Sequence, residues 1–145
     1  MTATQPPIAQ LVPHAGTMCL LEELDDWNDE HVIARTRSHL SRSNPLARDG
    51  RLHAIHLCEY GAQAMALHGG LLAHRDGGGP VPGFLVALRD VHLARFDAGE
   101  SPSPLIVEAR RLHGDATGWQ YDFTVTREGA RLASGRATIV LRRTP

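Results

Sequence analysis

The chain has 145 residues, which is enough for one domain with a sizeable buried core. Its formal net charge is −1 and its fifteen basic residues are scattered, so the charge pattern indicates neither a nucleic acid nor an anionic membrane as a partner. No apolar stretch approaches the length of a membrane span, and the amino-terminal residues lack the pattern of a secretion signal, so we expect a soluble, cytoplasmic protein.

The first third of the chain is predicted to contribute two strands and a long loop. After a loose lead-in over residues 1–7, we expect a short helical turn at residues 8–11 and a strand at residues 18–27. A polar turn follows, and residues 31–39 alternate well enough between apolar and polar side chains for a second strand. Residues 40–51 are rich in Ser, Asn, Pro, Arg, Asp and Gly, a composition typical of a loop.

Residues 52–72 have the length and composition of one long helix that is apolar or small almost all the way round. A helix without a polar face is usually buried, so we expect the rest of the chain to surround it. Its centre nevertheless carries Glu59, with His56 and Gln63 at helical spacing on the same line. A buried carboxyl group without a partner tends to keep its proton, which is what general acid–base chemistry requires. Glu59 is therefore the leading candidate for a functional residue, the alternative being a structural acid paired with backbone amides or an arginine.

The remainder of the chain is predicted to be four strands. They are expected at residues 81–93, 105–112, 118–127 and 130–141, after a glycine-rich link at residues 75–80. The third of these alternates most clearly and places its apolar residues on one face: Trp119, Tyr121, Phe123 and Val125. The link lacks both the lysine and the following helix of a phosphate-binding loop.

The expected order is thus two strands, one long helix and four strands, with short connections that favour antiparallel pairing. An α+β fold satisfies this order if one curved antiparallel sheet wraps around the helix, as a single domain over residues 1–145. One sheet cannot cover the whole circumference of a helix, so we expect a second copy to complete the enclosure.

Four stretches contain motifs that can be compared with known families. They are residues 11–22 (LVPHAGTMCLLE), residues 59–64 (EYGAQA), residues 84–93 (FLVALRDVHL) and the loop at residues 97–107. In their order and spacing they resemble the hotdog-fold superfamily and, within it, the 3-hydroxyacyl-[acyl-carrier-protein] dehydratases. The resemblance extends over about residues 8–141 and implies a hotdog fold, which agrees with the expected order of elements.

The resemblance also implies roles for individual residues. Glu59 takes the place of the family's catalytic acid, and Gln63 that of the glutamine one turn further along the helix. The family's second catalytic group, a histidine in a G-H-F-P-G loop, has no counterpart here, and Asn44 lies near its place. Ala54 occupies the position of the glycine whose amide binds the oxyanion. With these departures the chain is similar to the divergent dehydratase-like proteins of aryl-polyene synthesis.

The missing loop histidine leaves open which imidazole removes the α-proton. His14 is the preferred candidate, although it could instead be a capping residue in a turn, and His39 and His56 follow in that order. His53, His56 and Glu59 are spaced by three residues, but such a series drifts around a helix and matches no metalloenzyme signature. We therefore expect no metal and no cofactor.

The expected function is the dehydration of a (3R)-hydroxyacyl thioester to a trans-2-enoyl thioester. The acyl group would be carried by an acyl-carrier protein or by coenzyme A, and would enter a tunnel between two subunits of a homodimer or of a heterodimer with another hotdog subunit. His14 would take the α-proton, helix-start amides near Ala54 would hold the enolate, and Glu59 would protonate the leaving hydroxyl. Two alternatives remain: a non-catalytic accessory subunit that binds acyl chains or a dehydratase partner, and an acyl thioesterase.

Overall fold

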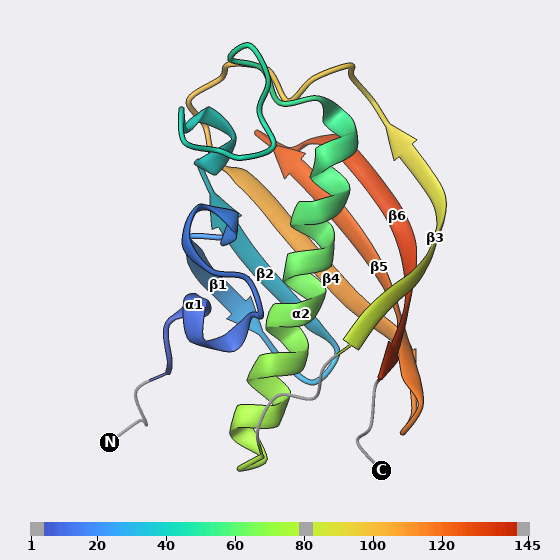
Figure 1. Ribbon diagram of the computed structural model, residues 1–145. Coiled ribbons are helices and arrows are strands. Elements are labelled where there is room, and N and C mark those ends of the chain that lie inside the picture. Colours follow the sequence, from blue (N-terminus) through green and yellow to red (C-terminus); the bar gives the residue numbers. More distant parts are fainter. Residues whose placement is uncertain (1–4, 79–82, 142–145) are drawn as a thin grey trace.

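The computed structural model describes residues 5–78 and 83–141. Over these residues the chain forms a six-stranded antiparallel sheet that curves around one long helix (Figure 1). The predicted α+β architecture and the order of its elements are confirmed. The expectations for residues 1–4 of the lead-in, for the end of the glycine-rich link and for the strand start at residues 81–82 lie outside the described residues.

The elements follow the predicted order. They are α1 (Ile8–Leu11), β1 (Glu23–Trp27), β2 (His31–Thr36), α2 (Leu57–Arg75), β3 (Gly83–Leu93), β4 (Leu105–Gly114), β5 (Gly118–Arg127) and β6 (Ala130–Leu141). Short 3₁₀ turns occur at Gly16–Met18, Ser38–Leu40 and Ala54–His56. The strands lie in the sheet in the order β1-β2-β4-β5-β6-β3, which places β1 and β3 at opposite edges (Figure 1). None of the helices within the described ranges is both long and apolar enough to cross a membrane.

The first two strands are shorter than predicted. The apolar run at residues 18–21 lies outside the sheet, because the backbone of Leu20 bonds to side chains instead: its N–H donates to Gln63 Oε1 (2.8 Å) and its carbonyl accepts from Thr36 Oγ1 (2.6 Å). β1 consequently begins only at Glu23. β2 ends at Thr36, since the chain turns at Ser38–Leu40. Leu20 is nevertheless fully buried, so the apolar pattern correctly indicated burial but not strand pairing.

The long helix begins later than predicted and ends later. α2 starts at Leu57 and continues to Arg75, because the residues before it pair with the loop that follows β3. The Ala54 N–H donates to the carbonyl of Phe96 (2.9 Å), and the carbonyl of Leu52 accepts from the N–H of Ala98 (2.9 Å). These bonds tie residues 52–54 to the loop after β3, so that His53 is extended and only the 3₁₀ turn Ala54–His56 precedes α2.

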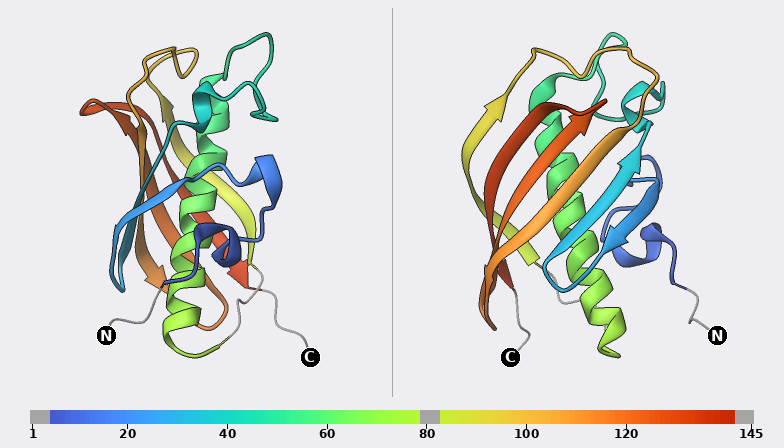
Figure 2. Two further views of the ribbon diagram at one scale, coloured as in Figure 1. Left: turned by 90° about the vertical axis from the view of Figure 1, so that its left-hand side faces the viewer. Right: turned by 180° about the vertical axis from the view of Figure 1, so that it is seen from behind.

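α2 lies on the concave face of the sheet, as both views of Figure 2 show. One side of the helix is incompletely covered within this chain: the small residues Ala62, Ala66, Gly69 and Ala73 are half-buried. The reason is the course of β3 at the edge of the sheet, where Phe84, Leu85 and Val86 are each about half exposed and do not cover the helix.

His68 is a histidine of α2 that lies entirely inside the fold. Its Nε2 donates to the carbonyl of Asn28 (2.8 Å), so its Nδ1 accepts from the hydroxyl of Tyr121 (2.7 Å). This is the neutral tautomer, and burial lowers the pKa of His68. Burial also lowers the pKa of His39, which is 6% exposed.

We expect the free energy of unfolding to decrease as the pH falls below about 6.5, the value at which histidines of the unfolded chain take up protons. Because the native pKa of His68 is lowered, the unfolded state binds more protons in this range, and stability is lost as the pH falls from that value towards the native pKa. Urea unfolding between pH 7.5 and about pH 5 measures the slope. His68→Gln should flatten it, whereas His74→Gln on the surface should not; equal slopes in wild type and His68→Gln would contradict the assignment.

Candidate active site

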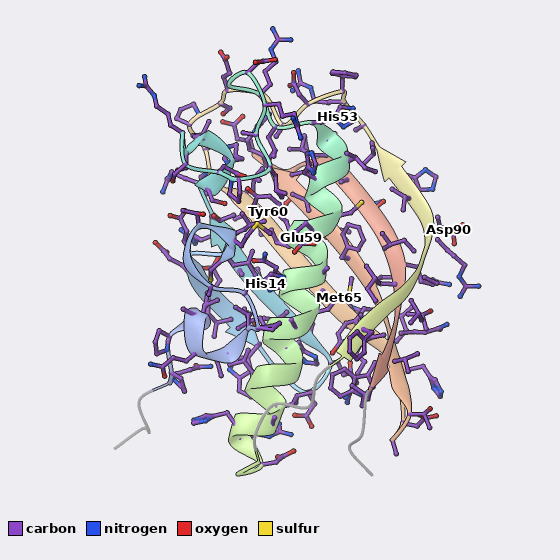
Figure 3. The ribbon with its side chains drawn as sticks, in the orientation of Figure 1. His14, His53, Glu59, Tyr60, Met65 and Asp90 are labelled. Carbon is purple, nitrogen blue, oxygen red and sulfur yellow. The ribbon has the colours of Figure 1, made fainter. Side chains whose placement is uncertain are left out.

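His14 and Glu59 lie in direct contact. His14 Nε2 is 3.0 Å from Glu59 Oε1, and the two side chains are 26% and 33% exposed. His14 comes from the segment between α1 and β1, and Glu59 from α2 (Figure 3). Glu59 is therefore half-buried rather than fully buried as predicted, because it lies towards the less covered side of the helix.

The segment that carries His14 is positioned by a close approach to α2. Leu11 and Val12 are buried, and the carbonyl oxygen of Leu11 lies against the Cα of Gly70, where a side chain of any size would collide with it. His14 Nδ1 is buried and has no hydrogen-bond partner among the described residues. Nε2 is thus the nitrogen of His14 that contacts Glu59.

Gln63 links the helix, the amino-terminal segment and the candidate acid. It is fully buried, its Nε2 donates to the carbonyl of Met18 (2.6 Å) and to Glu59 Oε1 (3.3 Å), and its Oε1 accepts from the N–H of Leu20. All these bonds are local to the contact between α2 and the segment before β1. Gln63 therefore fixes the position of the Glu59 carboxylate relative to His14.

Asn44 and His39 lie away from this contact. Asn44 Nδ2 donates to the carbonyl of Ser38 (2.9 Å) and to the hydroxyl of Tyr60 (3.0 Å), so it anchors the loop before α2. His39 Nε2 lies 3.4 Å from the carbonyl of Ser101. Neither residue is among those that line the cavity beside Glu59. Within one chain, both side chains therefore contact the loops around residues 38–44 and 101 rather than the cavity beside Glu59.

Ala54, the predicted site of the enolate donor, has its amide in a backbone hydrogen bond. Its amide N–H already donates to the carbonyl of Phe96, so this group is not free to hold an enolate oxygen. The sequence could not show this, because Phe96 follows Ala54 by more than forty residues and contributes only a backbone carbonyl.

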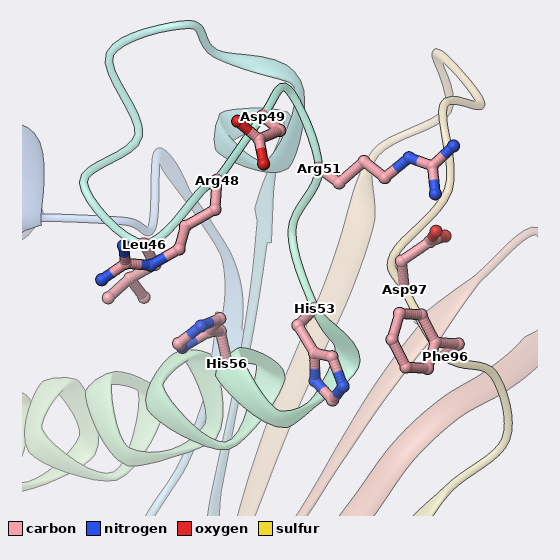
Figure 4. Close-up of a pocket in the computed structure, with 8 residues that line it drawn as sticks. All are labelled: Leu46, Arg48, Asp49, Arg51, His53, His56, Phe96 and Asp97. Carbon is pink, nitrogen blue, oxygen red and sulfur yellow. The ribbon is translucent and has the colours of Figure 1, made fainter.

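His53 and His56 belong to a separate cavity at the start of α2, of about 550 Å³ (Figure 4). His53 Nδ1 accepts from the N–H of Ile55 (3.0 Å), and its ring packs edge-on against Phe96. His56 lines the same cavity beside Arg48 and Arg51 rather than the cavity of Glu59. Among the described residues no cluster of three or more His, Cys, Asp or Glu side chains could hold a metal ion.

The cavity beside Glu59 has a volume of about 780 Å³. It follows α2 from the His14–Glu59 contact towards the carboxyl end of the helix, and most of its lining is apolar. Trp119 and Tyr121, which the alternation of β5 assigned to the core, form part of its wall. The small residues Ala62, Ala66, Gly69 and Ala73 recur at helical spacing, and this signal could have revealed the open side of the helix from the sequence.

Comparison with solved structures confirms the hotdog fold. The dehydratase heterocomplex ApeI:P from Xenorhabdus doucetiae contains a chain with a TM-score of 0.87 and 23% identity, covering 97% of this chain and 94% of that one. A hypothetical thioesterase from Streptococcus pneumoniae, solved with coenzyme A, has a TM-score of 0.61 and 18% identity, with coverage of 83% and 84%. An HP0420 homologue from Helicobacter felis has a TM-score of 0.66 and 14% identity, with coverage of 99% and 95%.

Comparison of the sequence itself matches one family model. No curated protein matches the chain. The family model described as ApeP-like, ApeP dehydratase, matches residues 6–143, which include the His14–Glu59 contact and the whole sheet. The resemblance to the dehydratase-like proteins of aryl-polyene synthesis is thereby confirmed, and the chain belongs to the ApeP-like dehydratase family.

Proposed function

We propose that this chain dehydrates a (3R)-hydroxyacyl thioester to a trans-2-enoyl thioester, in the synthesis of an aryl polyene or a similar acyl product. The observation that carries the proposal is the 3.0 Å contact between His14 Nε2 and Glu59 Oε1 at one end of a largely apolar cavity. An imidazole and a carboxyl group within hydrogen-bond distance supply a base and an acid, and the cavity can hold an acyl chain. No step requires a cofactor.

The elimination divides between the two side chains. His14 Nε2 takes the proton from the carbon next to the thioester carbonyl, and the electrons of that C–H bond form the new double bond. The bond from the β-carbon to oxygen breaks as Glu59 gives a proton to the hydroxyl, which leaves as water. The proton on His14 then returns to Glu59 across their contact, so the pair is restored without net proton exchange.

A second hotdog subunit completes the assembly in this proposal. β3 is an edge strand with unpaired backbone groups and with exposed apolar side chains at Phe84, Leu85, Val86 and Leu88. Such an edge favours pairing with another chain. The ApeI:P heterocomplex supports a related hotdog subunit as the partner.

Val86→Asp is expected to weaken subunit association at least tenfold, because it places a charge in an apolar contact. Sedimentation over a range of concentrations measures the change, for the chain alone and mixed with a hotdog subunit from the same source. Leu112→Asp, at an exposed apolar residue of β4, is the matched control and should associate as the wild type does. Association of Val86→Asp with wild-type affinity would rule out β3 as the interface.

The reaction is tested with 3-hydroxyacyl thioesters of acyl-carrier protein and of coenzyme A. Dehydration produces the ultraviolet absorbance of a conjugated enoyl thioester, whereas a thioesterase would release a free thiol.

A non-catalytic accessory role is a second candidate function, favoured by the Ala54 amide, which already donates a hydrogen bond to a backbone carbonyl. It would be indicated by a chain that is inactive alone and that raises the activity of a second subunit even when Glu59 is replaced.

A further inference from the structure

The cavity beside Glu59 follows a row of small side chains along α2. After Glu59 the helix residues facing it include Ala62, Ala66 and Gly69, which leave the helix surface smooth. Ten residues separate Glu59 from Gly69, so the distance along the helix axis is about 15 Å. Over this distance the cavity could accommodate an extended acyl chain whose thioester end lies at His14 and Glu59.

Trp119 closes the space between β5 and the helix at Gly69. A Cβ atom on Gly69 would be only 2.8 Å from the ring of Trp119, so the indole lies directly against the helix backbone. The ring is held in place on two sides: the guanidinium carbon of Arg111 is 5.6 Å from its centroid, and Tyr121 packs edge-on at 6.1 Å. Trp119 therefore brings the β5 wall of the cavity into contact with α2 at Gly69.

The lining changes from apolar to charged beyond this point. After Leu72 and Ala73 the helix contributes Arg75 and Asp76 to the lining, and Asp29, which pairs with Arg75, and Arg111 also line the cavity. An acyl chain that passed Trp119 would place its last methylenes among charged groups and water, where their burial no longer stabilises binding.

We propose that Trp119 sets the maximum length of the acyl chain, at roughly a dozen carbons in extended form. The inference rests on the proposed function, because it takes an acyl group to be the occupant of the cavity. Trp119 has no part in the chemistry and is a specificity-determining residue. Gly69 is its counterpart, since only a glycine lets the indole reach the helix backbone.

Binding of amide analogues of N-acetylcysteamine thioesters, which cannot react, tests the proposal on the full-length chain. Calorimetry with acyl groups from about six to about sixteen carbons should show affinity rising about fourfold per methylene and then levelling off near twelve. For Trp119→Ala we expect the rise to continue by two or more carbons before it levels off. Trp119→Phe keeps part of the wall and should shift the limit on acyl-chain length less. It replaces Trp119→Ala in the test if the alanine variant does not fold.

Trp27→Ala is the matched control. Trp27 is also half-buried and also packs against an arginine, Arg75, but does not line the cavity, so its loss should leave the length limit unchanged. An unchanged limit in both Trp119 variants, or a wild type without a limit, overturns the proposal. The analogues bind without turnover, so the two proposals can fail separately. A shifted length limit in a chain that makes no enoyl product would refute the proposed reaction and support the role of Trp119. Enoyl product from a chain whose limit does not shift in the Trp119 variants would support the reaction and refute that role.

Discussion

Glu59→Gln should reduce the formation of enoyl thioester by a factor of about 10² to 10⁴, the range that a positioned acid or base contributes. Glutamine keeps the length of the side chain and can still bond to Gln63, but it has no proton to give to the leaving hydroxyl. The initial rate of enoyl absorbance, measured at saturating substrate, gives the loss in kcat. The affinity for an unreactive amide analogue should change little, because the acyl cavity is untouched.

Two comparisons separate a catalytic role from a structural one. Glu100→Gln, at an exposed position, should keep wild-type activity, and the thermal midpoint of Glu59→Gln should stay close to that of wild type. Replacing His14 by Asn should cost about as much as Glu59→Gln, and the double variant little more, because residues that act as a unit are not additive. A Glu59→Gln chain with undiminished activity would remove the acid from the mechanism.

The His14–Glu59 contact shows how far a motif can specify a site. Neither residue is near the other in sequence, yet both occupy positions of a family motif, and the structure brings them to 3.0 Å. Gln63 was likewise predictable, since it lies one helical turn beyond Glu59. The relative positions of these residues follow from helix geometry and from a known fold, and sequence patterns describe both well.

The contacts that the sequence did not reveal are those of backbone groups whose hydrogen-bond partners are remote in the sequence. Ala54 was expected to offer a free amide, and the carbonyl of Phe96 occupies it. The apolar run at Leu20 was expected to be a strand, and its backbone bonds to Gln63 and Thr36 instead. Periodicity reports which side chains are buried, but it does not report which group satisfies each backbone N–H and carbonyl.

The small residues of α2 illustrate the same limit. They divide into two sets with different surroundings, which the sequence pattern does not distinguish. Gly61 lies against the ring of Phe123 in β5, whereas Ala62 and Ala66 face the cavity. One helical face thus has a glycine where the sheet is close, and the neighbouring face has alanines where it borders the cavity.

Gly61→Ala should destabilise the fold by about 1–3 kcal/mol, although alanine is the better helix former by about 1 kcal/mol. A Cβ at this position would overlap the Phe123 ring at atoms close to its attachment point. The far edge of the ring already lies close to the backbone of Gly135 in β6, where an added Cβ would be only 2.8 Å from it, so the ring has little room to move away from α2. Overpacking therefore outweighs the gain in helix propensity, and urea unfolding should show a lower midpoint with an unchanged slope.

A second substitution distinguishes this clash from a general effect of the helix. In a Phe123→Leu background the same Gly61→Ala change should cost less, and the difference is the coupling energy of the pair. Gly78→Ala, where the nearest atom is 3.9 Å away, is the control and should be close to neutral. A Gly61→Ala chain as stable as wild type would mean that helix propensity prevails.

Because Gly61 is two residues from Glu59 on the same helix, pushing α2 away from β5 should also move the carboxylate relative to His14, so enoyl formation should fall together with stability.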